Sequence, residues 1–235
     1  ILTEQQGLIG TIILNQLGKR NALGQTLLGE IIAALKDFQE GGVRVVIIRA
    51  TDDTKVWSSG HDIMELPSKE DPLHYSVPLE RVLRAIKKFP GPVIAMVHGS
   101  VWGGAVELVL CCDIVIGDET SQFAITPANL GLPFNTTGLL DFMRRLPFNV
   151  VKEMFFTAAP VKAVEAHKWG ILNHLVDSQE LEKVTYDMAR VIASKAPLAI
   201  AVIKEQLRVL AEAEPIAPAV MERIEELRHM VAHSE

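Results

Sequence analysis

The sequence predicts an α/β fold that ends in a helical region. In the first half, short β-branched apolar runs alternate with segments of helical periodicity, which is typical of a sheet covered by helices. From residue 137 onward the dominant pattern is helical. The 235 residues, 49% apolar and 22% charged, suit a globular chain, and α/β folds of this length usually form one domain.

Each predicted element has a local reason. Apolar runs bounded by glycine, proline or polar residues predict strands over 8–14, 43–49, 92–97, 113–117 and 122–125. Apolar residues three and four apart predict helices over 24–40, 78–89, 105–112, 139–146, 150–156, 161–168, 180–194, 198–212 and 219–232. The glycine pair at 41–42 ends the first helix. Ranges 50–60 and 67–75 predict loops, the second exposed and mobile.

Composition argues against several classes of protein. With 23 basic and 29 acidic residues the net charge is −6, so we expect no general attraction to nucleic acid or anionic lipid. Cys111 and Cys112 are adjacent and match no zinc or disulfide spacing; we read them as small apolar residues in a helix. The uncharged stretches 89–106 and 121–140 contain too many glycines and prolines to cross a membrane. Residues 1–10 show no targeting signal, so we expect a cytoplasmic protein.

The segment HGSVWGGAVEL, residues 98–108, is the most informative for function. It reads as a glycine-rich turn between a strand and a helix, and Gly103 and Gly104 at the helix start expose N–H groups without helical acceptors. Such groups suit an anion or a developing oxyanion, while close strand–helix packing is the structural alternative. Glu107 follows on the first helical turn. It is either an acid/base group facing a pocket or a carboxylate that favours the helix dipole.

A second polar segment, WSSGHDI, covers residues 57–63. Gly60 permits a tight turn, and Asp62 is able to cap the next segment of the chain. His61 invites a role as a base, but a single loop histidine is more often not catalytic, and its backbone N–H is a separate candidate.

With these segments and CCDIVIG at 111–117 in view, the chain resembles the enoyl-CoA hydratase/isomerase (crotonase) superfamily over nearly its whole length. KRNAL at 19–23 and KAPLAIAVIKEQLR at 195–208 agree. The resemblance implies the crotonase (ClpP-like) spiral of ββα units. Residues 1–175 would form the spiral core with the CoA-thioester site, and 176–235 a helical region for packing and oligomerisation.

The resemblance also implies the site. The N–H groups of His61 and Gly104 would hold the thioester oxygen, and Glu107 and Phe134 would complete the catalytic set. Substrate-binding positions would be Ala22, Leu23, Ser59, Gly60, Asp62, Ile63, Gly103, Thr126 and Asn135. No metal and no cofactor beyond the CoA of the substrate is implied. The partners would be an acyl-CoA and further copies of the chain, as a homotrimer or dimer of trimers.

Within the superfamily, GHDIMELP, GSVWGGAVE and TPANLGLPFN are most similar to its decarboxylases. This implies conversion of methylmalonyl-CoA, or a close relative, to propionyl-CoA and CO₂ through an enolate, within propionate or fatty acid metabolism. Hydratases carry a second glutamate where this chain has Pro127. The decarboxylases carry a tyrosine where it has Phe134, and Thr126, Asn135 or Thr136 are candidates to replace that hydroxyl. The alternatives are an isomerase or hydratase that uses Glu107, and a weakly active acyl-CoA binder.

Overall fold

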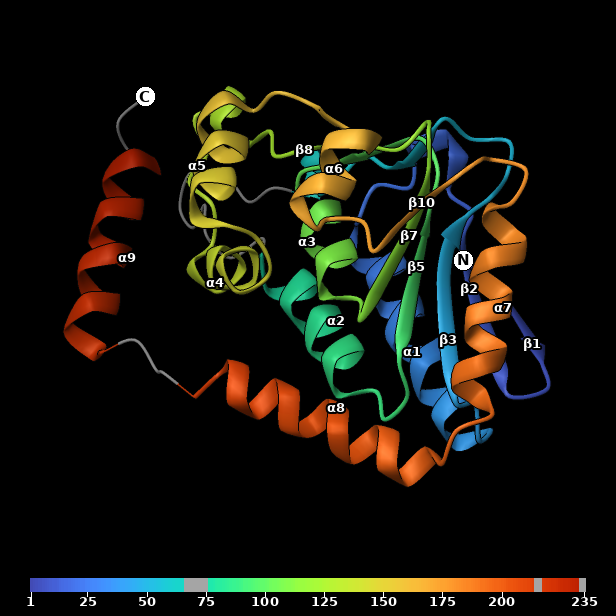
Figure 1. Cartoon of the computed structure of the whole chain (residues 1–235). Helices are drawn as coiled ribbons and strands as arrows, with labels where there is room; N and C mark the ends of the chain where they lie inside the picture. The colour runs from blue at the N-terminus through green and yellow to red at the C-terminus, as the bar shows by residue number, and fades with distance from the viewer. Residues whose placement is uncertain (66–75, 214–216, 233–235) are drawn as a thin grey trace.

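The structure is a computed structural model that describes residues 1–65, 76–213 and 217–232. The loop predicted over 67–75 lies outside these residues. Two sheets and a set of surrounding helices make up the fold (Figure 1).

The main sheet has six strands in the order β1-β2-β3-β5-β7-β10. They are β1 (Leu2–Gln6), β2 (Ile9–Leu14), β3 (Val45–Ala50), β5 (Val93–Val97), β7 (Ile114–Asp118) and β10 (His174–Val176). Only β1 is antiparallel to its neighbour, and the remaining pairs are parallel. The inner strands are buried along their length, as expected for a parallel sheet that is covered on both faces.

Helices cover both faces of this sheet. Along β3, Val46 and Ile48 pack toward α1 (Gln25–Glu40), α2 (Ser76–Lys88) and α3 (Gly104–Cys111). The alternate residues Val45 and Ile47 pack toward α7 (Leu181–Ala193). Alternation along the strand thus sends side chains to two separate apolar layers. In Figure 1, α7 lies on one side of the sheet and α1, α2 and α3 lie on the other.

A smaller sheet continues the strands of the main sheet. It has the order β4-β6-β8-β9, formed by β4 (Val56–Ser58), β6 (Ser100–Trp102), β8 (Gln122–Ala124) and β9 (Val161–Lys162). In sequence, β3-β4-α2, β5-β6-α3 and β7-β8-α4 (Thr136–Arg145) repeat one strand–strand–helix unit. The repeat confirms the predicted ββα architecture, and it brings the ends of β4 and β6 side by side.

The differences from the predicted elements have simple causes. The predicted loop over 50–60 contains β4, and the glycine-rich turn contains β6. Both are three-residue strands that pair only with distant segments, so no local pattern announces them. The predicted helix over 161–168 begins as β9 and becomes α6 (Ala163–Trp169) at residue 163. The short strands β1 and β10 escape prediction as well.

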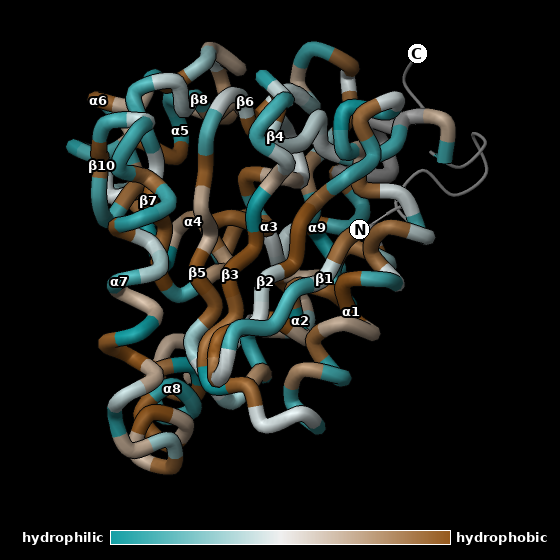
Figure 2. Tube along the Cα trace, turned by 90° about the vertical axis from the view of Figure 1, so that its right-hand side faces the viewer, coloured by the Kyte–Doolittle hydropathy of each residue, from teal (hydrophilic) through white to brown (hydrophobic). Residues whose placement is uncertain are grey.

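The last helices reach away from the sheets. After α5 (Phe148–Thr157), α6 and α7, the helices α8 (Pro197–Ala211) and α9 (Pro218–Ala232) extend outward (Figure 1). Large apolar side chains are exposed on α8, with Leu198 at 81% and Leu210 at 73%. The hydropathy tube shows apolar stretches on α8 as well as in the sheet (Figure 2). The predicted boundary at 175/176 stays a prediction, and α7, which follows it, packs on the main sheet.

One side chain anchors α8. The Lys204 ammonium donates to the carbonyl oxygens of Ile86 and Gly91 at 3.1 and 2.9 Å, and to the Asp113 carboxylate at 2.7 Å.

None of the described helices is both long and apolar enough to cross a bilayer.

Candidate active site

Two chain segments meet at the start of α3. Gly103 precedes the helix with φ +53°, which favours glycine, and its N–H donates to the Ala124 carbonyl at 2.8 Å. Gly104 is the first helical residue, so its N–H has no acceptor within the helix, and it donates to no other group of the described residues. That amide is therefore available to a ligand, and the partial positive charge of the helix start surrounds it.

The second segment passes directly over this amide. A Cβ on Gly60 would lie 2.5 Å from the Trp102 carbonyl oxygen and 3.4 Å from the Gly104 nitrogen, and its φ is +83°. A Cβ on Gly104 would lie 2.6 Å from His61 Nδ1. Any side chain at either glycine would push the segments apart. Glycine is thus required for close packing, and the same packing brings the His61 and Gly104 amides near each other.

A hydrogen bond fixes the direction of the Gly60–His61 peptide. The Gly60 carbonyl accepts from the Leu23 N–H at 2.7 Å, and Leu23 and His61 form an isolated parallel bridge. Because a trans peptide is planar, the His61 N–H points opposite to that carbonyl, away from Leu23. The segment containing Ala22 and Leu23 is therefore joined to the segment that carries His61.

Asn21 organises this junction, although the sequence did not single it out. It is fully buried with φ +51°, a conformation that asparagine tolerates better than most residues. Its side chain donates to the Trp57 carbonyl at 3.0 Å and accepts from the Gln16 N–H at 2.7 Å, while its own carbonyl accepts from Ser58 Oγ at 2.7 Å. Asparagine enrichment in left-handed turns was the available signal.

Asp62 ties the same segments together from the other side. Its carboxylate accepts from Lys19 Nζ at 2.7 Å and from the Met64 N–H at 3.1 Å, so it caps the short helix η2 (Ile63–Glu65) as the sequence suggested. The hydrogen bond from Lys19 lowers the pKa of the Asp62 carboxyl. Ser59 is half-buried, and its N–H donates to the Arg20 carbonyl at 2.9 Å.

Glu107 is buried beside the helix start. Its side chain is 1% exposed, Asn135 Nδ2 lies 3.4 Å from Oε2, and Oε1 has no hydrogen-bond partner among the described residues. Burial, and next the nearby Asp141 carboxylate, raise the pKa of Glu107 to about 8. The residue also lines a pocket of about 420 Å³. These observations favour the interpretation as a pocket-facing acid/base group, because a group that only favours the helix dipole would stay ionised.

The predicted acyl-side residues lie around these groups. Thr126 Oγ1 is 3.6 Å from the position a Cβ would take on Gly103. Phe134 packs edge-on against Phe142 and Phe155, with ring centroids 5.9 and 5.0 Å away. Asn135 caps α4 by accepting from the Gly138 N–H, so its amide is engaged at both ends. Phe134 and Glu107 both approach Gly138.

The His61 ring is neutral in this setting. Burial lowers the pKa of His61 to about 4, so the imidazole carries no charge at neutral pH. Leu79 approaches Gly104 on the same side and is 1% exposed, which makes the surroundings of the amide apolar. Within residues 1–65, 76–213 and 217–232, no three His, Cys, Asp or Glu side chains are grouped so as to hold a metal ion.

The structure gathers the predicted residues into two sets. The first surrounds the Gly104 amide and contains Leu23, Gly60, His61, Gly103, Gly104 and Thr126. The second lies one helical turn further on and contains Glu107, Phe134 and Asn135. Sequence reasoning missed Asp141 and Lys87 behind the second set, since their link to Glu107 depends on packing between α2, α3 and α4.

The repeated ββα units and the two segments that meet at the Gly104 amide together indicate the family of the protein. The enoyl-CoA hydratase/isomerase family profile matches residues 4–234, and the chain belongs to this family. The fold is the crotonase fold, as the matching solved structures also show.

Particular relatives are similar over nearly the full length. The chain is 47% identical to methylmalonyl-CoA decarboxylase of Escherichia coli K12 over 228 residues, 97% of this chain and 87% of that protein. It is 36% identical to human mitochondrial enoyl-CoA hydratase domain-containing protein 3, over 79% of this chain and 62% of that one. A solved methylmalonyl-CoA decarboxylase in complex with 2-nitronate-propionyl-CoA superimposes with a TM-score of 0.96 at 46% identity, covering 100% of this chain and 90% of that chain.

Proposed function

We propose that the protein is a CoA-thioester decarboxylase that converts methylmalonyl-CoA to propionyl-CoA and CO₂. The 47% identity to the E. coli decarboxylase and the close match to a decarboxylase complex support this substrate. The observation that carries the reaction type is the Gly104 amide at the helix start with the Gly60–His61 peptide packed against it.

The geometry suits formation of an enolate. When the bond to the departing carboxylate breaks, its electron pair moves into the thioester, and negative charge collects on the thioester oxygen. The N–H groups of His61 and Gly104 would hold that oxygen, and the start of α3 adds favourable partial charge. Apolar neighbours such as Leu79 strengthen these interactions because little water competes with them.

The remaining predicted residues take roles around this centre. The CoA arm would run along the joined segments that contain Ala22, Leu23, Ser59, Asp62 and Ile63. Thr126 and Phe134 would border the acyl group, with Thr126 offering a hydroxyl close to Gly103. Asn135 would act by orienting Glu107 rather than by holding substrate, since its amide already engages Glu107 and α4.

Glu107 would protonate the enolate. It lies one turn along α3 from Gly104, on the same side of the helix, and its raised pKa keeps it protonated at neutral pH. The carboxylate that leaves as CO₂ supplies its own electrons, so no base is needed. Hydration of a double bond in this family would use a second carboxylate, and position 127 holds proline.

Incubation of the purified protein with methylmalonyl-CoA tests the proposal. We expect equimolar propionyl-CoA and CO₂, measured by chromatography and by CO₂ trapping. Absence of both products, with turnover of an enoyl-CoA instead, would overturn it. That second outcome would favour double-bond isomerisation, for which a single buried, protonated carboxyl such as Glu107 suffices.

We also propose that the protein acts without a cofactor, in the cytoplasm, as a homotrimer or dimer of trimers. The exposed apolar side chains of α8 support self-association, since Leu198, Leu207 and Leu210 are each more than half exposed. Sedimentation velocity tests this proposal: a species of three or six chains is expected, and a monomer would contradict it.

A further inference from the structure

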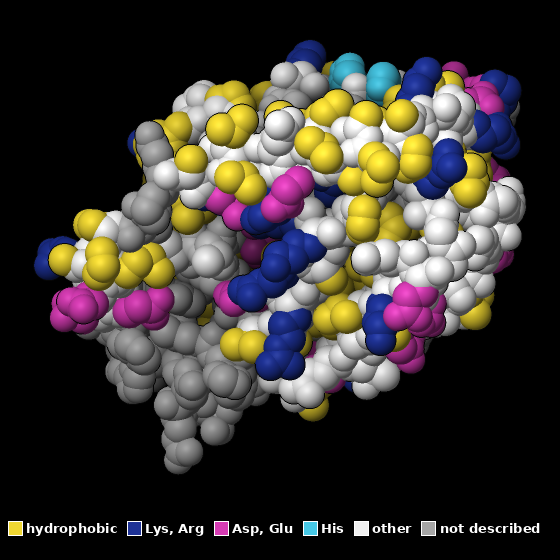
Figure 3. Space-filling view, turned by 90° about the horizontal axis from the view of Figure 1, so that it is seen from below, with side chains coloured by type: hydrophobic (Ala, Val, Ile, Leu, Met, Phe, Trp, Pro, Cys, Tyr) yellow, Lys and Arg dark blue, Asp and Glu magenta, His cyan; other side chains and the backbone are white. Residues whose placement is uncertain are grey.

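Glu107 lines a polar pocket. This pocket of about 420 Å³ lies between α2 and α4, beside the end of α8, and Glu80, Lys87, Glu107, Thr137, Asp141 and Arg208 are among its lining residues. On the face seen from below, basic and acidic side chains gather around a hollow (Figure 3). Of the residues predicted for catalysis and substrate binding, Glu107 alone lines the pocket. Glu107 thus lies on the wall of this pocket and one helical turn from Gly104.

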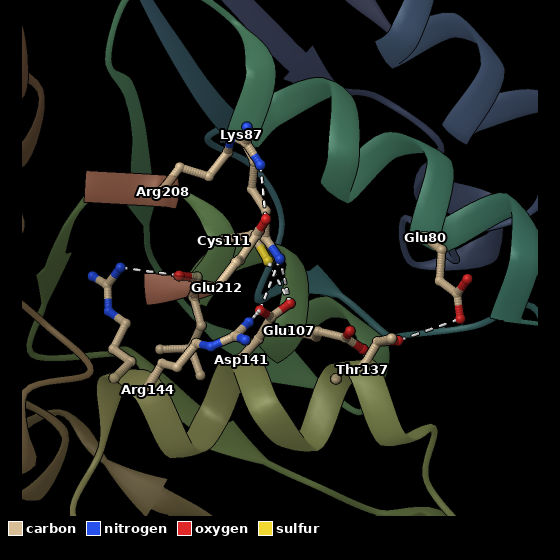
Figure 4. A network of polar contacts seen from close by, with 12 residues as sticks. Glu80, Lys87, Glu107, Cys111, Thr137, Asp141, Arg144, Arg208 and Glu212 are labelled. Carbon is tan, nitrogen blue, oxygen red and sulfur yellow. Dashed lines mark hydrogen bonds and ion pairs between the residues drawn. The ribbon is translucent and has the colours of Figure 1, made fainter. Parts of the chain in front are cut away.

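The inner wall of the pocket carries a tight ion pair. Lys87 Nζ donates to both carboxylate oxygens of Asp141 at 2.7 and 2.6 Å, and these side chains are 26% and 12% exposed. Figure 4 shows Glu107 between Asp141 and Thr137. Thr137, which is exposed, has its hydroxyl oxygen 3.0 Å from Asn135 Oδ1 and 3.4 Å from Glu80 Oε1. Polar side chains thus line the pocket beside the buried carboxyl, and Asn135, which contacts Thr137, lies 3.4 Å from Glu107 Oε2.

The proposed reaction needs such a route. Decarboxylation releases CO₂ without a proton, and the enolate carbon then takes one, so each turnover consumes one proton from the solvent. After Glu107 donates, its buried carboxylate must be protonated again. A bound thioester would lie near Gly104, which is not among the residues that line the pocket.

We propose that this pocket carries protons from solvent to Glu107, and that the Lys87–Asp141 pair is the positioning element that sets how readily Glu107 accepts one. The inference rests on the proposed decarboxylation. Asp141 places negative charge next to Glu107, which favours its protonated form, and Lys87 partly offsets that charge. The other groups that act on Glu107 are Glu80, which favours protonation, and Asn135, which opposes it.

The test compares pH profiles of kcat with methylmalonyl-CoA. Asp141→Asn removes the negative neighbour, so the alkaline limb is expected to move to lower pH by about one unit. Lys87→Gln leaves Asp141 uncompensated, so the limb is expected to move to higher pH. Shifts of the alkaline limb in opposite directions separate this role from general destabilisation. A merely destabilised variant would not move the limb in the direction that its change of charge predicts.

The matched controls are Asp187→Asn and Lys183→Gln, which break an exposed ion pair on α7 and should leave the profile unchanged. Should Asp141→Asn fail to fold by circular dichroism, Thr137→Leu at the pocket mouth replaces it. That variant is expected to lower kcat with KM unchanged and to enlarge the solvent isotope effect.

The outcomes remain distinguishable from those of the decarboxylation test. A wild-type protein that forms no propionyl-CoA refutes the proposed function. A wild-type protein that is active, with limbs that stay fixed in both pair variants or a Thr137→Leu variant that behaves as wild type, refutes the proton route alone.

Discussion

The two ends of α3 present opposite chemistry. At its start, Gly104 offers a main-chain amide in apolar surroundings, next to the neutral ring of His61. At its far end, Cys111 lies against Asp141, which Lys87 and Arg144 both contact. The first end depends on exact backbone positions and holds no charge of its own, whereas the second depends on charged side chains. Glu107 lies between them, so changes at the two ends should have separable effects.

The largest effect is expected from Gly104→Ala. The added Cβ would lie 2.6 Å from His61 Nδ1 and 3.0 Å from Leu79 Cδ2, so the buried His61 ring, or the segment that carries it, must move. We expect kcat to fall by about 10²–10³-fold, in the range seen when one oxyanion donor is lost. Steady-state kinetics on methylmalonyl-CoA measures this, with thermal melting as a control for folding. Activity within a few fold of wild type would exclude the paired amides as the reaction centre.

Glu107→Gln should follow, with a loss of about 10²-fold or more in kcat because the proton donor is removed. In the wild type, the protonated form is the active one. Activity should therefore persist below pH 8 and decline as the pH rises through about 8. A pH profile of wild type and variant checks both points. Equal turnover of the two proteins would remove Glu107 from the mechanism.

The same substitution should stabilise the fold in alkaline solution. The folded-state pKa of Glu107 is raised from 4.5 to about 8, so the wild type loses stability as the pH rises between these values. Gln carries no such cost. The advantage of Glu107→Gln in free energy of unfolding should grow from pH 5 to pH 8, by at most about 1.4 kcal/mol for each step of one in pH, and then level off. Urea unfolding at several pH values measures it, and a constant difference would contradict the raised pKa.

A smaller gain is expected from Phe134→Tyr. The resemblance to the decarboxylases implies a tyrosine at this position, and an added hydroxyl would be able to donate to the carboxylate that leaves. One such hydrogen bond is worth about 1 kcal/mol, so kcat/KM should rise by roughly fivefold. The ratio of kcat/KM between methylmalonyl-CoA and a substrate without the carboxylate tests the change. A drop in kcat/KM for both substrates would indicate that the edge-on packing with Phe142 and Phe155 does not tolerate the hydroxyl.

How far the sequence predicts the molecule differs between its parts. The buried strands β2, β3, β5 and β7 and the amphipathic helices were predictable, because each carries its own apolar pattern. The short strands β4 and β6 were not, since pairing between distant segments forms them. The glycine-rich turn around Gly104 was predictable from the local spacing of its glycines. Asn21 offered only the general preference of asparagine for left-handed turns, and the Lys87–Asp141 pair gave no signal because the two residues lie 54 positions apart in sequence.

The bond from Leu23 to Gly60 has a consequence for how such enzymes diversify. It joins the proposed CoA-binding segment, with Leu23, to the segment that carries the His61 N–H, one of the two proposed oxyanion donors. The buried Asn21 reinforces this connection. Residues 126–136, which would face the variable end of the substrate, belong to a different stretch of chain. Substitutions in residues 126–136 can therefore change the acyl group that is accepted while CoA binding is kept, so one scaffold is able to support different reactions.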